Sequence, residues 1–194
     1  WSEPVISSTG DILGTFAIYD REPRAPQQQD LNFIRDSARL AGIAIERKRA
    51  ENDLRVSEQR FRAIFEQAAV GVAVIDSHSG MFRRINQKYS DIIGYSVEEM
   101  QTLDFMQITH PDDLQPDLLN MQKLLAGELR DFSMEKRLIQ KEGAIVWVNL
   151  TVSPMWDRDE PPDFHIAIIE DITSRKQAEI VLDGRNEALE LLAN

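Results

Sequence analysis

Apolar and polar residues alternate over residues 4–20, where the sequence reads PVISSTGDILGTFAIYD. This pattern is typical of two strands joined by a tight turn, and Gly10 and Asp11 suit the turn geometry. The segment REPRAPQQQD then supplies two prolines before a helical period begins. That period predicts one long helix from about Leu31 to Ala68.

Two apolar stripes follow the predicted long helix. The first runs along its whole length and the second only along its first half, so that the first half can pack on a domain and on a partner at once. The second half, ERKRAENDLRVSEQR, keeps one narrow stripe among charges and is typical of a coiled-coil connector. The first stripe includes Phe33, Leu40, Ile43, Leu54, Phe61 and Ile64, and the second consists of Ile34, Ala38, Ala41 and Ile45.

The period returns to that of strands at Val70. VGVAVID and MFRRIN predict a second hairpin, DFSMEKRLIQKEG and AIVWVNLTVSPMW predict two longer strands, and residues 164–169 form a last apolar run. Helical segments stand only between the second and third of these five strands. A doubly wound fold would need strands and helices to alternate, so the order predicts an α+β domain: a five-stranded antiparallel sheet with helices on one face.

Three helix starts are expected in the segment between those strands. Asn86 is a candidate cap, and Ser96 with Glu99 stands at the spacing of a capping box. Thr109 with Asp112 has the same spacing and predicts the start of a longer helix.

The last strand passes almost directly into a charged helix in FHIAIIEDITSRKQAEIVL, residues 164–182. Asp171 or Thr173 is expected to accept hydrogen bonds from the first free amides of that helix, while Ile172 stays with the apolar surface. Heptad spacing continues along the helix with one charged interruption, which predicts a weak coiled coil. The heptad positions are Ala178, Leu182, Arg185, Leu189 and Leu192.

Composition argues against several classes of function. The 194 residues carry a net charge of -11, with 33 acidic and 22 basic residues, which argues against a nucleic-acid or anionic-membrane surface. The absence of cysteine excludes disulfides, thiolate nucleophiles and cysteinyl flavin adducts. No apolar run approaches the length of a membrane span and the first residues are not a signal peptide, so a cytoplasmic location is expected.

Several motifs together resemble a PAS domain over residues 59–173. They are RFRAIFEQAAVGVAVID, INQKYSDIIGYSVEEM, ITHPDDL, MEKRLIQKEGAIVWVNLTVSPM and IAIIEDITSRKQAE, in the order and spacing of that family. Residues 1–49 resemble the last hairpin and final helix of a GAF domain, which leaves residues 50–58 as a helical linker and 174–194 as an exit helix. RNEALELLAN resembles the start of a following module. The resemblance implies a bacterial multidomain sensor whose output domain, in the same chain, is a histidine kinase or a cyclic-di-GMP enzyme.

Catalytic and metal chemistry find little support. His110 in THPDDL could suggest a metal site or a general base, but its neighbours describe a helix start and no second histidine stands at ligand spacing. Haem-binding PAS domains take an axial histidine from the following helix, which here has none, and Met121 is a poor substitute. The sequence therefore predicts no metal site, no haem and no covalent flavin, and leaves a non-covalent small molecule open.

Strand alternation and the family resemblance together select the side chains that face the space between sheet and helices. Apolar lining alone does not distinguish a ligand pocket from a filled core, and both interpretations stay open. The inward Lys136 needs a partner, which could be a ligand carboxylate or phosphate, or a structural group such as Glu66 or a backbone carbonyl; the structural partner is favoured. The candidate pocket consists of Ala73, Ile75, Ile85, Tyr89, Ile92, Met121, Leu125, Lys136, Leu138, Val148, Leu150, Val152, Ala167 and Ile169.

The opposite face of the sheet presents apolar side chains that need a cover. The long helix before the domain is the favoured cover, and a second subunit is the alternative. We expect a parallel homodimer formed through that helix and this sheet face, with Leu54, Phe61, Ile64, Phe65, Ile166 and Ile168 at the interface. Signal coupling to the exit helix is assigned to Trp147, Asp171, Ile172 and Thr173.

Three functions follow as hypotheses. The favoured one is sensing followed by relay through the exit helix, and the first alternative is a ligandless module that dimerises or spaces its neighbours. An enzyme is the second alternative, but the sequence offers no nucleophile with an oriented base.

Overall fold

A computed structural model describes residues 1–157 and 160–182 of the chain. The chain divides into two compact units, the first spanning Trp1–Arg62 and the second beginning at Ala63. Helix α1 (Gln28–Gln67) starts in the first unit and ends in the second. It confirms the single long helix that the sequence predicts. No helix within the described residues is long and apolar enough to cross a membrane.

The first unit is a hairpin packed against the first half of α1. Strands β1 (Ser2–Ile6) and β2 (Ile12–Ala17) pair antiparallel, which confirms the predicted hairpin. The second apolar stripe of the helix is the buried one, since Ile34 and Ala38 are almost fully covered. Gly42 allows the close approach, because a Cβ there would lie 2.8 Å from the Ile6 carbonyl oxygen.

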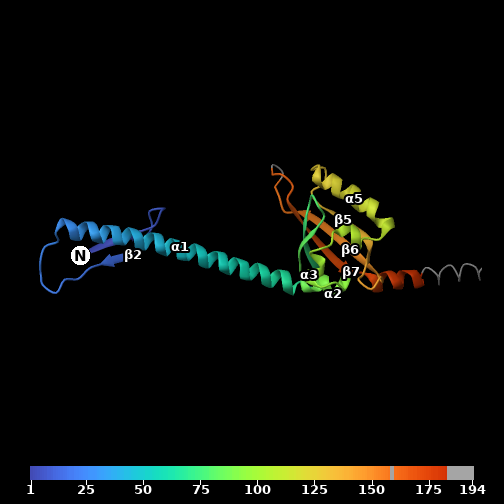
Figure 1. The fold of residues 1–194 in the computed structure, drawn as a ribbon, viewed down its shortest axis with the longest axis horizontal. Helices are drawn as coiled ribbons and strands as arrows, with labels where there is room; N and C mark the ends of the chain where they lie inside the picture. Colours follow the sequence, from blue (N-terminus) through green and yellow to red (C-terminus); the bar gives the residue numbers. More distant parts are fainter. Residues whose placement is uncertain (158–159, 183–194) are drawn as a thin grey trace, which may run out of the picture. The chain divides into compact units, whose positions relative to one another are not determined.

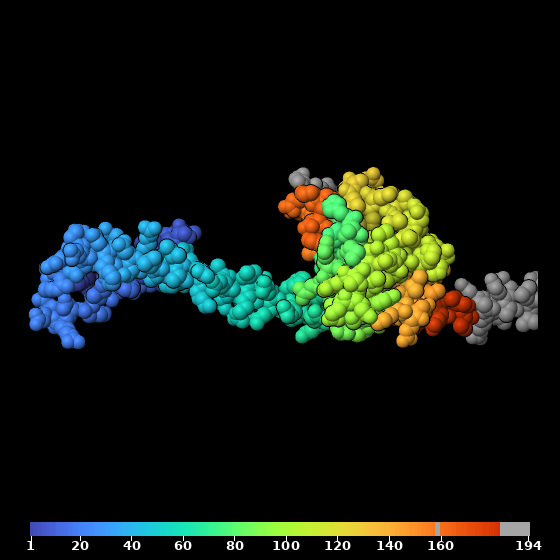
Figure 2. Space-filling view, in the orientation of Figure 1, coloured from blue at the N-terminus to red at the C-terminus, as the bar shows by residue number. Residues whose placement is uncertain are grey.

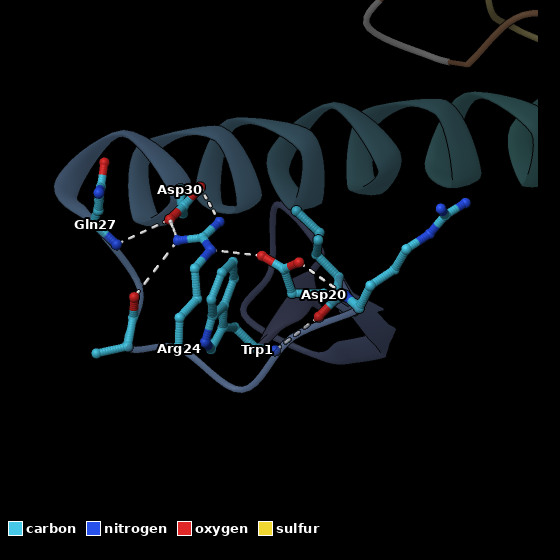
Figure 3. A network of polar contacts seen from close by, with 8 residues as sticks. Trp1, Asp20, Arg24, Gln27 and Asp30 are labelled. Carbon is cyan, nitrogen blue, oxygen red and sulfur yellow. Dashed lines mark hydrogen bonds and ion pairs between the residues drawn. The ribbon is translucent and has the colours of Figure 1, made fainter.

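A polar network fastens the loop between β2 and α1 (Figure 3). The Arg24 guanidinium lies 2.5 Å from an Asp20 carboxylate oxygen and 2.6 Å from an Asp30 oxygen, and it stacks over the Trp1 ring at 4.6 Å. Asp30 also accepts the amide of Gln27 at the start of the helix. These contacts fix the path of the loop.

The second unit contains the predicted five-stranded antiparallel sheet, in the order β4-β3-β7-β6-β5. Helices α2 to α5 lie between β4 and β5 in sequence and pack on one face of the sheet (Figure 1). Figure 2 shows the atoms of this helical segment forming much of one face of the unit. The strands are β3 (Gly71–Asp76), β4 (Phe82–Ile85), β5 (Phe132–Ile139), β6 (Ile145–Pro154) and β7 (Phe164–Asp171), and the helices are α2 (Gln87–Ile93), α3 (Val97–Met100), α4 (Phe105–Ile108) and α5 (Pro111–Leu125).

Asn86 joins three elements of the second unit and is completely buried. Its Oδ1 accepts the amides of Val72 in β3 and Tyr89 in α2, each at 2.9 Å. Its Nδ2 donates to the carbonyl oxygens of Phe65 in α1 and Val70, at 2.9 and 3.0 Å. The predicted cap is therefore confirmed, and it also ties the end of α1 to the sheet.

The other predicted helix starts are confirmed in one case and wrong in the other. Ser96 and Glu99 form the expected capping box at α3. At α5 the cap is His110, whose Nδ1 accepts the Asp112 amide at 3.3 Å. Thr109 instead ends α4, and its buried hydroxyl donates to the Phe105 carbonyl oxygen at 2.7 Å.

The exit helix begins at residue 173, directly after β7, and is described to residue 182. The predicted heptad positions Arg185, Leu189 and Leu192, together with RNEALELLAN, lie outside the described residues.

Candidate functional site

A small cavity lies between the helices and the inner face of the sheet. Its volume is about 20 Å³, which is room for about one water molecule. Its lining is mostly apolar, with polar groups from α2, α5, β5 and β7. The lining residues are Ile75, Tyr89, Phe105, Ile108, Asp117, Met121, Lys136, Leu138, Leu150, Val152, His165, Ala167 and Ile169.

Most of the predicted pocket residues lie at this cavity or beside it. Ala73, Ile85, Ile92 and Val148 are buried in the same core without lining the cavity. The remaining predicted residues, apart from Leu125, line it: Ile75, Tyr89, Met121, Lys136, Leu138, Leu150, Val152, Ala167 and Ile169.

The placement of Leu125 in the pocket is wrong. Helix α5 turns Asp117, Met121 and Leu124 toward the core, which is the ordinary three–four spacing of one helix face. Leu125 is one position further round and is only half-buried. Its apolar neighbour Leu124 fills the core instead.

A buried ion pair lies at the wall of the cavity. The Lys136 ammonium lies 2.5 Å from Asp117 Oδ2 and donates to the Thr109 hydroxyl at 3.0 Å. Both charged side chains are nearly inaccessible, at 4% and 2% of their full exposure. Desolvation lowers the pKa of Lys136, while the Asp117 carboxylate opposes that shift.

The structural partner expected for Lys136 exists, but it is not Glu66. Glu66 lies instead near Arg84 and the Gln87 amide, at 4.0 and 3.3 Å. The sequence analysis did not identify Asp117 as the partner of Lys136, although the sequence contains a pattern that indicates it. It stands four residues before Met121 on the inward stripe of α5, and a carboxylate there opposite an inward lysine indicates a buried pair.

Two further polar groups face the cavity. Tyr89 is 3% exposed, and its hydroxyl has no hydrogen-bond partner among the residues that the structure describes. Burial raises the pKa of this hydroxyl well above its ordinary value, so it stays protonated. The His165 ring lies with Nδ1 2.9 Å from Ser77 Oγ, and burial lowers its pKa to about 4. His165 is therefore neutral near pH 7.

Strand β5 links the cavity to two helices through three consecutive residues. Lys136 points inward, whereas its neighbours Glu135 and Arg137 point the other way. Arg137 binds Asp113 in the first turn of α5 through both its Nε and NH2, at 2.9 and 2.8 Å. This hydrogen bonding holds the pKa of Asp113 below its usual range.

Glu135 reaches the exit helix. Its carboxylate lies 2.7 Å from the Arg175 guanidinium and 2.6 Å from the Lys176 ammonium. These hydrogen bonds lower the pKa of Glu135 and raise that of Lys176. The sequence analysis missed this contact, because no pattern relates residues 40 positions apart.

The residues assigned to signal coupling do come together at the start of the exit helix. Trp147 in β6 donates its amide to Thr173 Oγ1 at 3.0 Å and accepts the Ile172 amide at 2.9 Å. Asp171 Oδ1 accepts the Thr173 amide at 2.9 Å, and Ile172 is buried as expected. The Trp147 ring is covered by Arg137 and Lys176, each at 5.4 Å. Cations from β5 and the exit helix thus lie against this ring.

The residues assigned to a dimer interface differ in exposure. Leu54, Phe61 and Ile64 are exposed on α1, at 62%, 46% and 75%. Phe65 is buried, with the Arg84 guanidinium 4.8 Å from its ring centre. Ile166 and Ile168 on the outer sheet face are half-buried.

Within the described residues no group of three or more histidine, aspartate or glutamate side chains is arranged to hold a metal ion. The Ser77–His165 pair is the nearest approach to a nucleophile and base, but both side chains are buried in the core. The arrangement is a small, mostly apolar cavity with four polar residues in its lining, and strands β5 and β6, which contribute to that lining, are bonded to the exit helix.

Comparison with known proteins identifies the fold. Residues 82–169 match the family described as PAS fold. The sensory box histidine kinase/response regulator of Burkholderia thailandensis has a structure that superposes with a TM-score of 0.54 at 23% identity, covering 68% of this chain and 98% of that one. The second unit therefore has the PAS fold.

Curated proteins similar to this chain include a sensor and a probable diguanylate cyclase. The methyl sulfide methyltransferase-associated sensor of Methanosarcina acetivorans is 34% identical over 99% of this chain and 19% of its own length. The probable diguanylate cyclase DgcE of Escherichia coli is 40% identical over 64% of this chain and 11% of its own length. The chain thus spans a fifth or less of the length of these two relatives.

Proposed function

We propose that this chain is a sensory and relay segment of a signalling protein, in which a change at the core cavity is passed to the exit helix. The observation that carries the proposal is the bonding around Trp147. Its strand, β6, contributes Leu150 and Val152 to the cavity wall, and its backbone holds Ile172 and Thr173 at the start of the helix. A shift of β6 would therefore move the exit helix directly.

Strand β5 offers a second route of the same kind. Lys136 is bonded inside the cavity and Glu135, the adjacent residue, is bonded to the exit helix. Since neighbouring residues of a strand share one backbone, displacement of the Lys136 side chain by a ligand would change the position of Glu135.

The rest of the proposal concerns the parent protein. We infer that the first unit is the end of a GAF domain, that the chain forms a parallel homodimer through α1 and the outer sheet face, and that the segment works in the cytoplasm without catalysis of its own. The output domain would be a histidine kinase or a cyclic-di-GMP enzyme in the same chain. The likeness to DgcE supports the second of these outputs.

Substitution of Asp171 tests the relay. Asp171→Ala removes the side chain that accepts the Thr173 amide, so the helix start loses an anchor while the core stays intact. We expect the full-length protein carrying Asp171→Ala to fold normally and to lose the response of its output activity to the stimulus. Asp163→Ala is the matched control, because this exposed carboxylate has no side-chain partner within the described part of the chain. Unchanged output in Asp171→Ala would contradict the relay.

A second function, a ligandless module that sets the spacing or pairing of its neighbours, is supported by the size of the cavity. A volume of about 20 Å³ leaves no room for a metabolite unless side chains move. Thermal unfolding against a panel of small metabolites separates the two functions, because only a sensor gains stability from its ligand.

A further inference from the structure

The cavity is lined by an unusual set of polar groups for so small a space. Tyr89, for whose hydroxyl no hydrogen bond is found among the described residues, lines it from α2. The Lys136–Asp117 pair and the His165 ring form other parts of its wall. No fully enclosed side-chain nitrogen or oxygen lacks a partner within the described residues, so the Tyr89 hydroxyl keeps some accessible surface, and a guest that bonds to it is stabilised relative to an apolar one.

The charges around the cavity cancel. The Lys136 ammonium and the Asp117 carboxylate lie 2.5 Å apart. Their net charge is zero whether the proton stays on the amine or moves to the carboxylate. The Tyr89 hydroxyl and the His165 ring are both neutral. A guest carrying a net charge would therefore enter a low-dielectric space with no counter-charge available, which is strongly unfavourable.

We propose that this cavity binds an uncharged molecule of a few heavy atoms, whose polar group bonds to the Tyr89 hydroxyl and whose apolar part contacts Met121 and Ile169. This inference rests on the proposed sensory function and specifies its ligand class. It excludes the carboxylate or phosphate that an unpaired Lys136 would have selected.

The surroundings allow modest growth of the cavity. Met121 is unbranched and adapts its shape, and Phe105 comes from α4, a helix of four residues. The Ile169 side chain has little room to move toward β3, because it already packs over Gly71, where a Cβ would lie 2.6 Å from Ile169 Cγ1. Guests of about the size of acetamide are the appropriate probes.

Three molecules of nearly the same shape test the charge preference. Acetamide is neutral, acetate is an anion and acetamidinium is a cation. Each is titrated into the 194-residue chain, and binding is followed by the chemical shifts of the Tyr89 and Ala167 amides. We expect acetamide to bind more tightly than either ion by at least about a hundredfold.

Two variants locate the effect. Tyr89→Phe keeps the ring and the ion pair but removes the hydroxyl, and we expect it to weaken acetamide binding about three- to tenfold. Tyr95→Phe, at a partly buried tyrosine that does not line the cavity, is the matched control and leaves the affinity unchanged. Asp117→Asn leaves Lys136 without its counter-charge, and we expect acetate to bind this variant at least as tightly as acetamide.

The outcomes are distinct from those that test the relay. Binding of acetate by the wild-type chain as tight as that of acetamide, binding of none of the three molecules, or equal affinity in Tyr89→Phe would overturn this inference. A retained preference for acetamide in Asp117→Asn would also contradict it. If Asp117→Asn does not fold, the comparison of Tyr89→Phe with its control Tyr95→Phe still tests the inference. Failure of the relay is seen separately, as an output response that Asp171→Ala leaves intact.

Discussion

At the scale of single residues, His165 makes the stability of the domain depend on pH. Its pKa is about 4 in the folded state against an ordinary value of 6.5, because burial disfavours the charged ring. Between these two values the unfolded state binds the proton and the folded state does not. Stability is therefore complete above pH 6.5 and is lost progressively as the pH falls toward 4.

We expect this residue to contribute a loss of about 2 kcal/mol between about pH 7 and about pH 5. His165→Gln, which can still bond to Ser77, should remove that part of the pH dependence. Urea unfolding of both proteins at the two pH values measures the difference. His78→Gln, at an exposed histidine of the β3–β4 turn, serves as the control. An identical pH dependence in His165→Gln and the wild type would contradict the assignment.

The sequence predicted residue directions better than residue partners. Alternation along MEKRLI correctly turned Lys136 inward, because each strand residue faces opposite to its neighbours. It could not identify Asp117, which lies 19 positions away on a helix whose rotation had to be known first. The helical period left that rotation uncertain by one position, and for the same reason Leu125 was turned toward the core, where Leu124 lies instead.

At the scale of elements, the exit helix is attached to the sheet by two kinds of contact. The backbone bonds of Trp147 fix its first residues, and the ion pairs of Glu135 fix its first turn. The Glu135 pairs are partly exposed, so solvent and salt weaken them. They should control how often the helix leaves the sheet more than whether the domain is folded.

Glu135→Gln should therefore raise amide hydrogen exchange in residues 173–182 by about two- to fivefold. The midpoint of global unfolding should stay unchanged, because the core residues keep their contacts. In about 1 M salt the variant and the wild type should converge, since the ion pairs are then screened. Glu142→Gln, an equal change in the exposed β5–β6 turn, should have no effect on exchange. Equal exchange in Glu135→Gln and the wild type at low salt would rule out this attachment.

Element boundaries followed the local chemistry where that chemistry was unambiguous. Asn86 and the pair of Ser96 and Glu99 were found from spacing, because a cap needs only residues that are close in sequence. Thr109 satisfied the same spacing, but its hydroxyl is required by the Phe105 carbonyl and the Lys136 ammonium. A tertiary contact thus moved the cap of α5 to His110.

At the scale of the whole molecule, the oligomeric state of the chain depends on the exposed apolar stripe of α1. Leu40, Ile43 and Leu54 are more than half exposed, although they belong to the stripe that sequence periodicity identified. Three–four spacing predicts a stripe but not what covers it, which is why the fold could be read from the sequence and the assembly could not. A second copy in parallel register would bury each of these side chains against its own equivalent.

The proposed dimer makes a quantitative prediction at Leu54. Each buried leucine contributes about 1.5–3 kcal/mol, and a two-fold interface counts every residue twice. Leu54→Asp should therefore weaken the dimer by at least about a hundredfold, which sedimentation equilibrium over a range of protein concentrations can measure. Asn52→Asp adds the same charge two residues away, on a different face of the helix, and should leave the association constant within about twofold of the wild type. A wild-type chain that sediments as a monomer at high concentration, or a Leu54→Asp chain that associates as tightly as the wild type, would show that this stripe does not pair two copies.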